Sequence, residues 1–452
     1  MQLRYQFRLD PTPGQRIALT KVFGCARVVF NDGLALRKQA WETDKSRIPT
    51  GELARRVITV AKRTPERAWL AEVSVDALQS AIRDLDAAYG SFFASVTGKR
   101  KGPRILPPRF KSKRDNRQSV RFSRNGFRLR GERLNLARVG DVRVRWSRRL
   151  PSVPSSATVI RDAAGRFFCS FVVEVEPQTL PDVEQVTGVD LGLGHFAVLS
   201  DGTKIDNPRF LRRAEKKLGK EQRDLSRKTK GSSNRAKARV RVARAHARVA
   251  DARREFHHQL STRLIRDNQA VAVEDLAVKG LARTRLAKSV HDAGWTQFVA
   301  MLEYKAALYG RQFVRAGRFE PTSRVCSACG VKDGPKPLNV RVWTCGACGT
   351  ALDRDINAAV NVAKAAGLAV TACGAQVRPE RVPAPRGETG THPKGLLSGG
   401  LRREFPSFRR GGSQLIAPPS FGLSQYPSPT RHRHQLPAGG RPTKPTTRLP
   451  AA

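Results

Sequence analysis

Four of the seven cysteines fall in two C-x-x-C pairs, Cys326 with Cys329 and Cys345 with Cys348. The pairs are 15 residues apart, and a glycine follows each pair at once. Two such knuckles can bring four thiolates to one tetrahedral Zn2+ ion, and the glycines relieve the crowded turn in which backbone N–H groups face sulfur. Because the protein supplies all four positions, we expect a structural zinc site. Chance pairs and a redox C-x-x-C are the weaker interpretations.

Three acids from separate segments suggest a second metal site. Asp190 interrupts the apolar run Gly188–Gly192, Glu274 ends the apolar run Val271–Val273, and Asp355 follows the cysteine pairs. A carboxylate in such surroundings is costly unless a cation compensates it. Together the three acids could hold two Mg2+ ions about 4 Å apart, one activating water and one stabilising a leaving 3′ oxygen. Taken singly, each acid could instead be a turn or helix-cap residue.

Charge identifies the class of partner. The chain has 84 Lys and Arg against 38 Asp and Glu, a formal net charge of +46 and a sequence pI near 11.4. Such an excess favours a large polyanion, and nucleic acid is the better candidate, since no run approaches the ~18 apolar residues of a membrane span. The start of the chain has no signal-peptide pattern, so we expect a cytoplasmic protein. Cys25, Cys169 and Cys373 are expected to be packed or incidental.

The first part of the chain predicts a small antiparallel sheet or barrel with a helical insertion. Met1–Asp10 alternates as a strand, and Thr12 with Pro13 predicts a helix start, followed by mostly helical sequence to about Ser95. From Val120 to Trp146 apolar residues alternate with arginines. Hairpin turns are expected at Asn125-Gly126, at Gly131-Glu132 and around Ala163-Ala164-Gly165.

A second unit is expected from about Val186. It opens with a strand at Gly188–Leu191, continues through a hairpin at Ser200–Gly202 and then forms a long helical stretch that breaks at Gly231–Ser233. Residues 211–254 carry 17 basic against 4 acidic side chains, which favours nucleic-acid contact over a merely solvated face. A buried strand then ends at Glu274, and a helix is expected over Trp295–Tyr309. From about Gly374 the chain is rich in proline and lacks periodicity, which predicts disorder.

The order of these blocks resembles the TnpB proteins, the OrfB-type proteins of insertion sequences, which are similar to type V CRISPR effector nucleases. Four ordered blocks carry the resemblance, namely Gly188–Gly192, Val273–Leu276, the two cysteine pairs and Asp353–Ala359. Shorter matches lie at Pro11–Gln15, Arg109–Lys113, Ser200–Gly202 and Asp292–Trp295. The likeness runs from about Met1 to Gly367.

The resemblance implies a multidomain chain of α/β and α+β class. It implies a wedge-like β domain over residues 1–185 with a helical recognition insertion at about 12–95. An RNase H-like RuvC nuclease domain would follow over 186–373, with a zinc ribbon at about 321–350. The tail over 374–452, which its composition predicts to be disordered, lies outside the resemblance.

The resemblance also assigns roles. Asp190, Glu274 and Asp355 would be the catalytic, Mg2+-binding triad, the four cysteines the zinc ligands, and Asp353 at most a supporting residue. The function implied is RNA-guided cleavage of double-stranded DNA beside a short flanking motif, with a guide RNA from the end of the element. The alternatives are a transposase that exchanges strands itself and a zinc-ribbon DNA-binding regulator of transposition.

Overall fold

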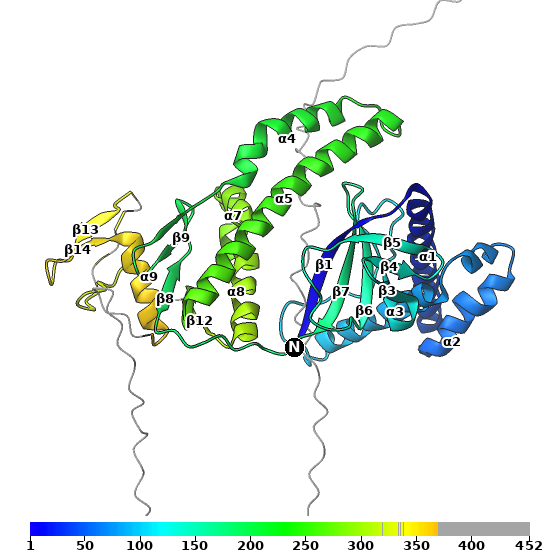
Figure 1. The fold of residues 1–452 in the computed structure, drawn as a ribbon, viewed down its shortest axis with the longest axis horizontal. Coiled ribbons are helices and arrows are strands. Elements are labelled where there is room, and N and C mark those ends of the chain that lie inside the picture. The colour runs from blue at the N-terminus through cyan, green and yellow to red at the C-terminus, as the bar shows by residue number, and fades with distance from the viewer. Residues whose placement is uncertain (319, 333, 335, 338, 369–452) are drawn as a thin grey trace, which may run out of the picture. The chain divides into compact units, whose positions relative to one another are not determined.

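The computed structural model describes residues 1–318, 320–332, 334, 336–337 and 339–368 of the 452-residue chain (Figure 1). The expected disordered tail at 374–452 and Cys373 lie outside these residues. In the described part no helix is both long enough and apolar enough to cross a membrane.

Seven strands between Gln2 and Glu174 form one antiparallel sheet. Its order is β2-β6-β7-β1-β5-β4-β3. The strands are β1 (Gln2–Asp10), β2 (Gln118–Ser123), β3 (Phe127–Arg130), β4 (Arg133–Leu136), β5 (Gly140–Arg145), β6 (Ser156–Arg161) and β7 (Phe167–Glu174). The N-terminal strand β1 pairs with β7 from Gln2↔Glu174 to Leu9↔Phe167, so the first strand completes the sheet after the helical insertion.

The sheet is curled, because its two edge strands are consecutive in sequence. Strand β2 ends at Ser123 and β3 begins at Phe127, with one 3-10 turn at Arg124–Gly126 between them. So short a link requires the two edges to approach each other, as in the predicted barrel-like form. The prediction of a hairpin at Asn125-Gly126 is therefore wrong. The turn joins β2 and β3, which lie at opposite ends of the strand order. Gly126 lies against Phe122 and Asp76, where a Cβ would not fit.

The other two predicted hairpins are confirmed. Strands β3 and β4 pair as far as Arg130↔Arg133 around Gly131, and β6 and β7 are joined by the turn at Gly165, where φ is +76°. The alternation along these strands is also confirmed in the main, with one exception. Leu129, expected on the apolar face, is exposed, since β3 is an edge strand with little of the chain to cover it.

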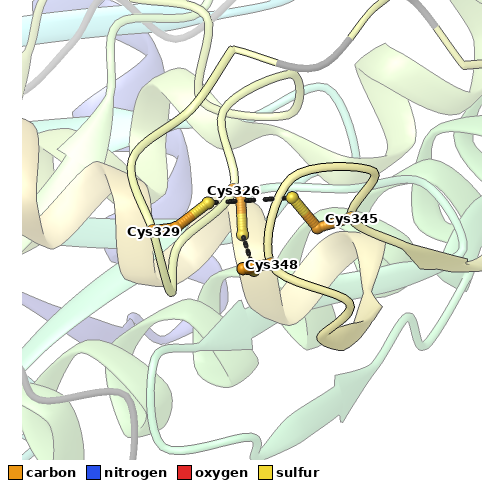
Figure 2. Close-up of side chains that lie close together, drawn as sticks. All are labelled: Cys326, Cys329, Cys345 and Cys348. Carbon is orange, nitrogen blue, oxygen red and sulfur yellow. Dashed lines mark hydrogen bonds between the residues drawn. The ribbon is translucent and has the colours of Figure 1, made fainter.

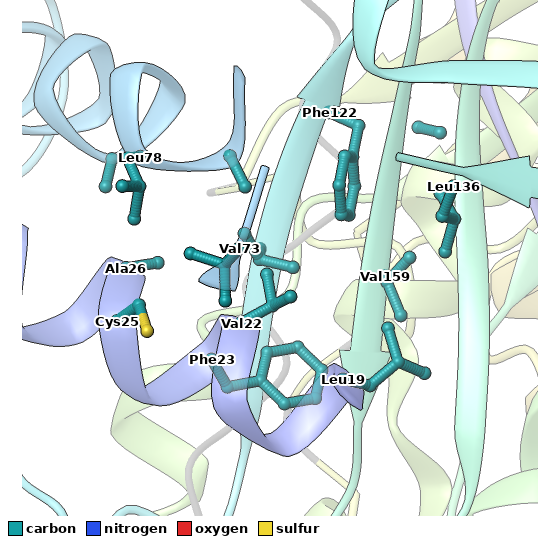
Figure 3. Close-up of a cluster of buried hydrophobic side chains, with 14 of the residues drawn as sticks. Leu19, Val22, Phe23, Cys25, Ala26, Val73, Leu78, Phe122, Leu136 and Val159 are labelled. Carbon is teal, nitrogen blue, oxygen red and sulfur yellow. The ribbon is translucent and has the colours of Figure 1, made fainter. Parts of the chain in front are cut away.

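The helical insertion packs against this sheet. It contains α1 (Pro13–Asp44), α2 (Thr50–Ala54) and α3 (Val75–Val96), with π- and 3-10-helical turns between α2 and α3. Thr12 caps α1, accepting from the backbone N–H of Gln15 at 3.3 Å, while Gln15 Oε1 accepts from Thr12 N at 3.0 Å. Figure 3 shows the core they share: Leu19, Val22 and Phe23 of α1 lie against Phe122, Leu136 and Val159 of the strands. Cys25 and Cys169 are buried, as predicted.

A mixed five-stranded sheet follows, in the order β10-β9-β8-β11-β12. Its strands are β8 (Val186–Asp190), β9 (His195–Leu199), β10 (Lys204–Asp206), β11 (Ala270–Glu274) and β12 (Gln312–Ala316). The first three form an antiparallel meander, and β8, β11 and β12 run parallel. The helices are α4 (Phe210–Ser226), α5 (Ser233–Asp267), α6 (Val278–Leu281), α7 (Ala287–Ala293), α8 (Trp295–Tyr309) and α9 (Arg354–Ala365).

Helices cover both faces of this sheet. On one face Val271 and Val273 pack with Leu264 of α5 and Phe298 of α8. On the other face the alternate strand residues Ala270 and Ala272 pack with side chains of α9. The first four residues of β11, Ala270–Val273, are thus apolar because they are buried on both faces. The predicted helix Trp295–Tyr309 matches α8, and the predicted break at Gly231–Ser233 separates α4 from α5, where Ser232 caps α5.

Candidate metal sites

The four cysteines converge on one point. Cys326 and Cys329 lie in the segment after β12, and Cys345 and Cys348 follow β13 (Val342–Thr344), which pairs with β14 (Ala351–Asp353). All four Sγ atoms lie within 4.8 Å of one another (Figure 2), and the Cys326–Cys348 and Cys329–Cys345 sulfur pairs are each 3.7 Å apart. Tetrahedral Zn2+ with Zn–S bonds of about 2.3 Å requires sulfur atoms about 3.8 Å apart. The cluster therefore fits a zinc ion without rearrangement.

Both knuckles have the same backbone geometry. Gly330 N donates to Cys326 O, and Gly349 N donates to Cys345 O, each at 2.9 Å. The two glycines have φ of +77° and +70°, a conformation that side chains rarely adopt. The glycines singled out in the sequence are thus required by the turn that aims each pair of sulfur atoms.

The cysteine cluster is attached to α9 through two asparagines. Asn357 Oδ1 accepts from Ser327 N at 2.7 Å, and its Nδ2 donates to Val325 O at 2.9 Å. Asn361 Nδ2 donates to Val325 O at 2.7 Å and to Thr322 O at 2.8 Å. Both asparagines are buried, so these bonds are shielded from water. The first knuckle and the helix that carries Asp355 form one hydrogen-bonded unit.

Two of the three predicted acids lie at the same edge of the sheet. Strands β8 and β11 are parallel neighbours, with Val189 opposite Val273. Asp190 and Glu274, the next residue on each strand, therefore end neighbouring strands side by side. Such strand ends are where open α/β sheets place ligand-binding side chains.

The charge of Asp355 affects the ionisation of Asp190. Burial, together with the negative charges of Glu274 and Asp355, raises the pKa of Asp190 to about 7. Burial also raises the pKa of Glu274, with a contribution from Asp275. A buried acid whose ionisation is opposed by two neighbouring carboxylates fits a cation that would relieve the repulsion. Their oxygens are less tightly grouped than the sulfurs: within the described residues, the cysteines are the sole set of three or more candidate ligands all within 4.8 Å.

Helix α9 can lie close to β8 because residue 188 is glycine. A Cβ at Gly188 would stand 2.0 Å from the carbonyl oxygen of Ala359 and 2.7 Å from the backbone nitrogen of Ala363. The glycine in the block Gly188–Gly192 thus sets the separation between Asp190 on the strand and Asp355 on the helix.

No pattern in the sequence predicted which residues contact Asp355 or fix its position. Arg341 Nη1 contacts both carboxylate oxygens, at 3.2 and 3.3 Å. Asp353 caps α9 by accepting from Asp355 N at 3.0 Å and Ile356 N at 3.1 Å, and it pairs with Lys204 at 2.6 Å. Asp353, expected to be at most a supporting residue, thus fixes the turn that presents Asp355. The Lys204 pair spans 149 residues of sequence, so local pattern could not reveal it.

Three protein-family models match parts of this chain. Residues 170–285 match a family model described as "Probable transposase" (OrfB_IS605), and residues 295–362 match a Cas12f1-like TNB domain. Residues 1–46 match a model described as a helix-turn-helix domain. In this chain that segment is strand β1 followed by the single helix α1, so it holds no helix-turn-helix.

Two relatives match along most of their length. A protein of Streptomyces pristinaespiralis, by name a proposed RNA-guided DNA endonuclease, is 43% identical over 381 residues, which are 83% of this chain and 92% of the relative. A protein of Escherichia coli (strain K12) with the same kind of name is 32% identical over 396 residues, 83% of this chain and 95% of the relative. Among solved structures, the Cas12f1–sgRNA–target DNA complex aligns at 13% identity and a TM-score of 0.47, covering 77% of this chain and 82% of that one.

The matched family model and the two relatives define the class of OrfB-type insertion-sequence proteins. The chain belongs to the TnpB family.

Proposed function

We propose that this protein is an RNA-guided, Mg2+-dependent DNA endonuclease encoded by a transposable element. One observation carries the proposal: Asp190 and Glu274 end neighbouring parallel strands, and Asp355 is close enough that its charge raises the pKa of Asp190. The names of the two relatives support the same activity. Cleavage would fall beside a short flanking motif, with the sequence chosen by base pairing to RNA.

The domain assignments are part of this proposal. Residues 186–373 would form a RuvC-type, RNase H-like nuclease domain, which the mixed sheet covered by helices on both faces supports. Residues 1–185 would form the wedge with its helical insertion at about 12–95, which the curled sheet supports. The zinc ribbon, at about 321–350, would be a structural insertion in the nuclease domain.

Asp190, Glu274 and Asp355 would hold the catalytic Mg2+. Hard divalent cations prefer carboxylate oxygens, and a cation at this edge of the sheet would offset the repulsion that raises the pKa of Asp190. When bound, Mg2+ supplies Lewis-acid charge for hydrolysis of the phosphodiester.

The residues around the triad have positioning roles. Strands β8 and β11 hold Asp190 and Glu274 in register, and Asp353 fixes the first turn of α9, so that Asp355 projects from a capped helix end. Arg341 steadies the Asp355 carboxylate through both of its oxygens. The zinc held by Cys326, Cys329, Cys345 and Cys348 would keep the segment carrying Arg341 folded over α9.

Basic side chains outside the triad would bind the guide RNA and the target DNA. Residues 99–149 carry 19 Lys and Arg against 3 acids. Within the described part of the chain, the arginines Arg209, Arg212 and Arg213 line a pocket at the start of α4, next to Gly194 of the loop that follows Asp190. Such clusters neutralise phosphates, and their contacts weaken with salt.

One observation favours a second candidate, a transposase that exchanges strands itself: the description of the family model that matches residues 170–285. Such enzymes usually require a covalent Tyr or Ser nucleophile or a different acidic triad. The chain has five tyrosines and none beside a His pair, which favours the endonuclease. A zinc-ribbon DNA-binding regulator with purely structural carboxylates would bind DNA without cutting it.

The test is cleavage by the purified chain. Protein is isolated with its copurifying RNA, the RNA is sequenced, and a duplex matching its guide segment is offered with Mg2+. The endonuclease proposal expects double-strand cleavage that needs both the RNA and the metal. Binding without cleavage would favour the regulator, and strand joining without RNA would favour the transposase.

A further inference from the structure

A basic pocket lies apart from the triad, beside α3 at the β2 edge of the seven-stranded sheet. Its volume is about 310 Å3. Residues of four neighbouring strands and one helix line it, including Arg4 of β1, Arg83 of α3, Arg121 of β2, and the serines Ser123, Ser155 and Ser156. Pockets of this volume lie at the lower end of the range that holds small ligands. The cavity is therefore suited to a group the size of one nucleotide or smaller.

The charges in the pocket are not balanced. Arg121 pairs with Asp84, with Nη2 and Oδ1 2.7 Å apart. Arg4 and Arg83 make no ion pair within the part of the chain that the structure describes. Three guanidinium groups from three elements thus line a pocket with two carboxylates beside it, Asp84 paired with Arg121 and Asp76 bonded to Ser123. Like charges gathered from separate elements repel one another, and an anion bound among them would relieve that repulsion.

One donor in the pocket wall is unsatisfied. Arg121 Nε is buried and has no hydrogen-bond partner among the described residues. A buried N–H without an acceptor is destabilising. The Ser156 side chain likewise makes no hydrogen bond to any described residue. The pocket therefore offers donors and positive charge, and its open requirement is an acceptor with negative charge.

Phosphate meets this requirement better than a metal or an apolar group. Guanidinium groups bind phosphate oxygens through paired, charge-assisted hydrogen bonds. The Ser156 hydroxyl can donate to the same oxygens, whereas those of Ser123 and Ser155 already donate to Asp76 Oδ1 and Val172 O. A cation is excluded by the excess positive charge. We propose that this pocket binds one backbone phosphate of a nucleic acid at a site separate from the cleavage centre. The inference rests on the proposed function only in taking nucleic acid as the partner.

The experiment measures binding rather than cleavage. The full-length chain, freed of copurifying RNA and without added Mg2+, is titrated with a 30-nucleotide oligouridylate and with single-stranded DNA of equal length at several salt concentrations. The variants are Arg4→Gln, Arg83→Gln and the double variant. Arg263→Gln is the matched control, because Arg263 is an exposed arginine of α5 that lies outside the pocket and outside the basic residues assigned to nucleic-acid binding. Arg121 is left intact, since its loss would leave Asp84 without its partner.

A shared phosphate makes the two substitutions non-additive. Each single variant is expected to bind both oligonucleotides about tenfold more weakly, from the loss of a charged hydrogen bond. The double variant should be at most about twofold weaker than the single variants, with the salt slope reduced by about 0.7 for one lost single-strand phosphate contact. Arg263→Gln should change the affinity less than threefold.

Three outcomes would overturn the pocket. These are additive losses in the double variant, a loss no larger than that of Arg263→Gln, or a loss confined to RNA, which would point to recognition of the 2′-hydroxyl or base. Failure of the wild-type chain to bind either oligonucleotide would overturn the proposed nucleic-acid function with it. Normal wild-type binding with unaffected variants would overturn the pocket alone.

Discussion

At the scale of single residues, Gly188 controls how close Asp355 on α9 can come to Asp190 on β8. The space for its missing Cβ is occupied by the backbone of α9, at Ala359 and Ala363. A glycine in a strand costs some stability, yet here no other residue fits. The sequence marked this position only as part of a family block, because the backbone it faces lies about 170 residues further along the chain.

Gly188→Ala is expected to be strongly destabilising, by about 3 kcal/mol, because the added carbon overlaps backbone rather than a movable side chain. Cleavage should fall with it, since α9 carries Asp355. Urea denaturation and a cleavage assay measure the two effects. Gly194→Ala is the control, as nothing lies within 4 Å of a Cβ built there. Equal stability of the two variants would contradict the close packing of α9 on β8.

A buried histidine in α5 predicts sensitivity to acid. Burial lowers the pKa of His257 to about 4, and its Nε2 lies 2.9 Å from Ala293 O. Burial lowers the pKa of the adjacent His258 to about 4 as well. In the unfolded chain both would take up protons near pH 6.5. The stability due to their neutral forms is therefore complete above pH 6.5 and is lost as pH falls toward 4.

For His257 alone the loss between pH 7.5 and pH 5 should be about 2 kcal/mol. Urea midpoints at the two pH values measure it. In His257→Gln, which keeps a polar side chain but does not titrate, the pH dependence should shrink by that amount. An unchanged pH dependence in the variant would show that His257 is not buried in its neutral form.

At the scale of elements, local sequence predicted those features that local chemistry determines. The cap at Thr12, the helix Trp295–Tyr309 and the break before α5 all follow from neighbouring residues. The paired cysteines were equally clear, since tetrahedral ligation imposes their spacing. The prediction at Asn125-Gly126 was wrong because a turn dipeptide does not specify which strands it joins.

Long-range pairs could not be predicted in this way. Arg341 and Asp355 meet only after the ribbon has folded over α9, and Asn361 is an ordinary polar helix residue until its bonds to Thr322 and Val325 are seen. Nothing in their spacing distinguishes them from solvated side chains. The acids themselves were identified by apolar strand context together with family order, and their convergence required the parallel pairing of β8 with β11.

Zinc is expected to hold the ribbon and α9 together. Cys345→Ser should reduce the bound zinc from one ion per chain to well below one, and cleavage should weaken because the segment around Asp355 loosens. Metal analysis and a cleavage assay are the measurements. Cys373→Ser, which changes a cysteine outside the cluster, should retain full zinc. An intact wild-type chain without zinc would contradict the proposed site.

At the scale of the whole molecule, binding and cleavage would depend on different residues. Basic surfaces would bind nucleic acid, and the three acids would hold the metal for cleavage. A net charge of +46 accounts for nucleic-acid binding in general, but it selects neither a sequence nor a reaction. Base pairing with a guide RNA would select the target sequence, and the carboxylates at the edge of the five-stranded sheet would support its hydrolysis. Affinity and cleavage should therefore be separable by substitution, which neither the regulator nor the transposase interpretation requires.

The most direct measurement is cleavage of a guide-matched duplex by Asp190→Asn, with its copurified RNA and Mg2+ present. Asparagine keeps the size of the side chain but removes the charge that would hold the metal. We predict a loss of about three orders of magnitude or more in cleavage rate, with RNA and DNA affinity unchanged or slightly higher. Asp275→Asn, beside Glu274 but paired with Arg318, should cut nearly as the wild type does. Cleavage by Asp190→Asn at the wild-type rate would contradict the assignment of the nuclease site.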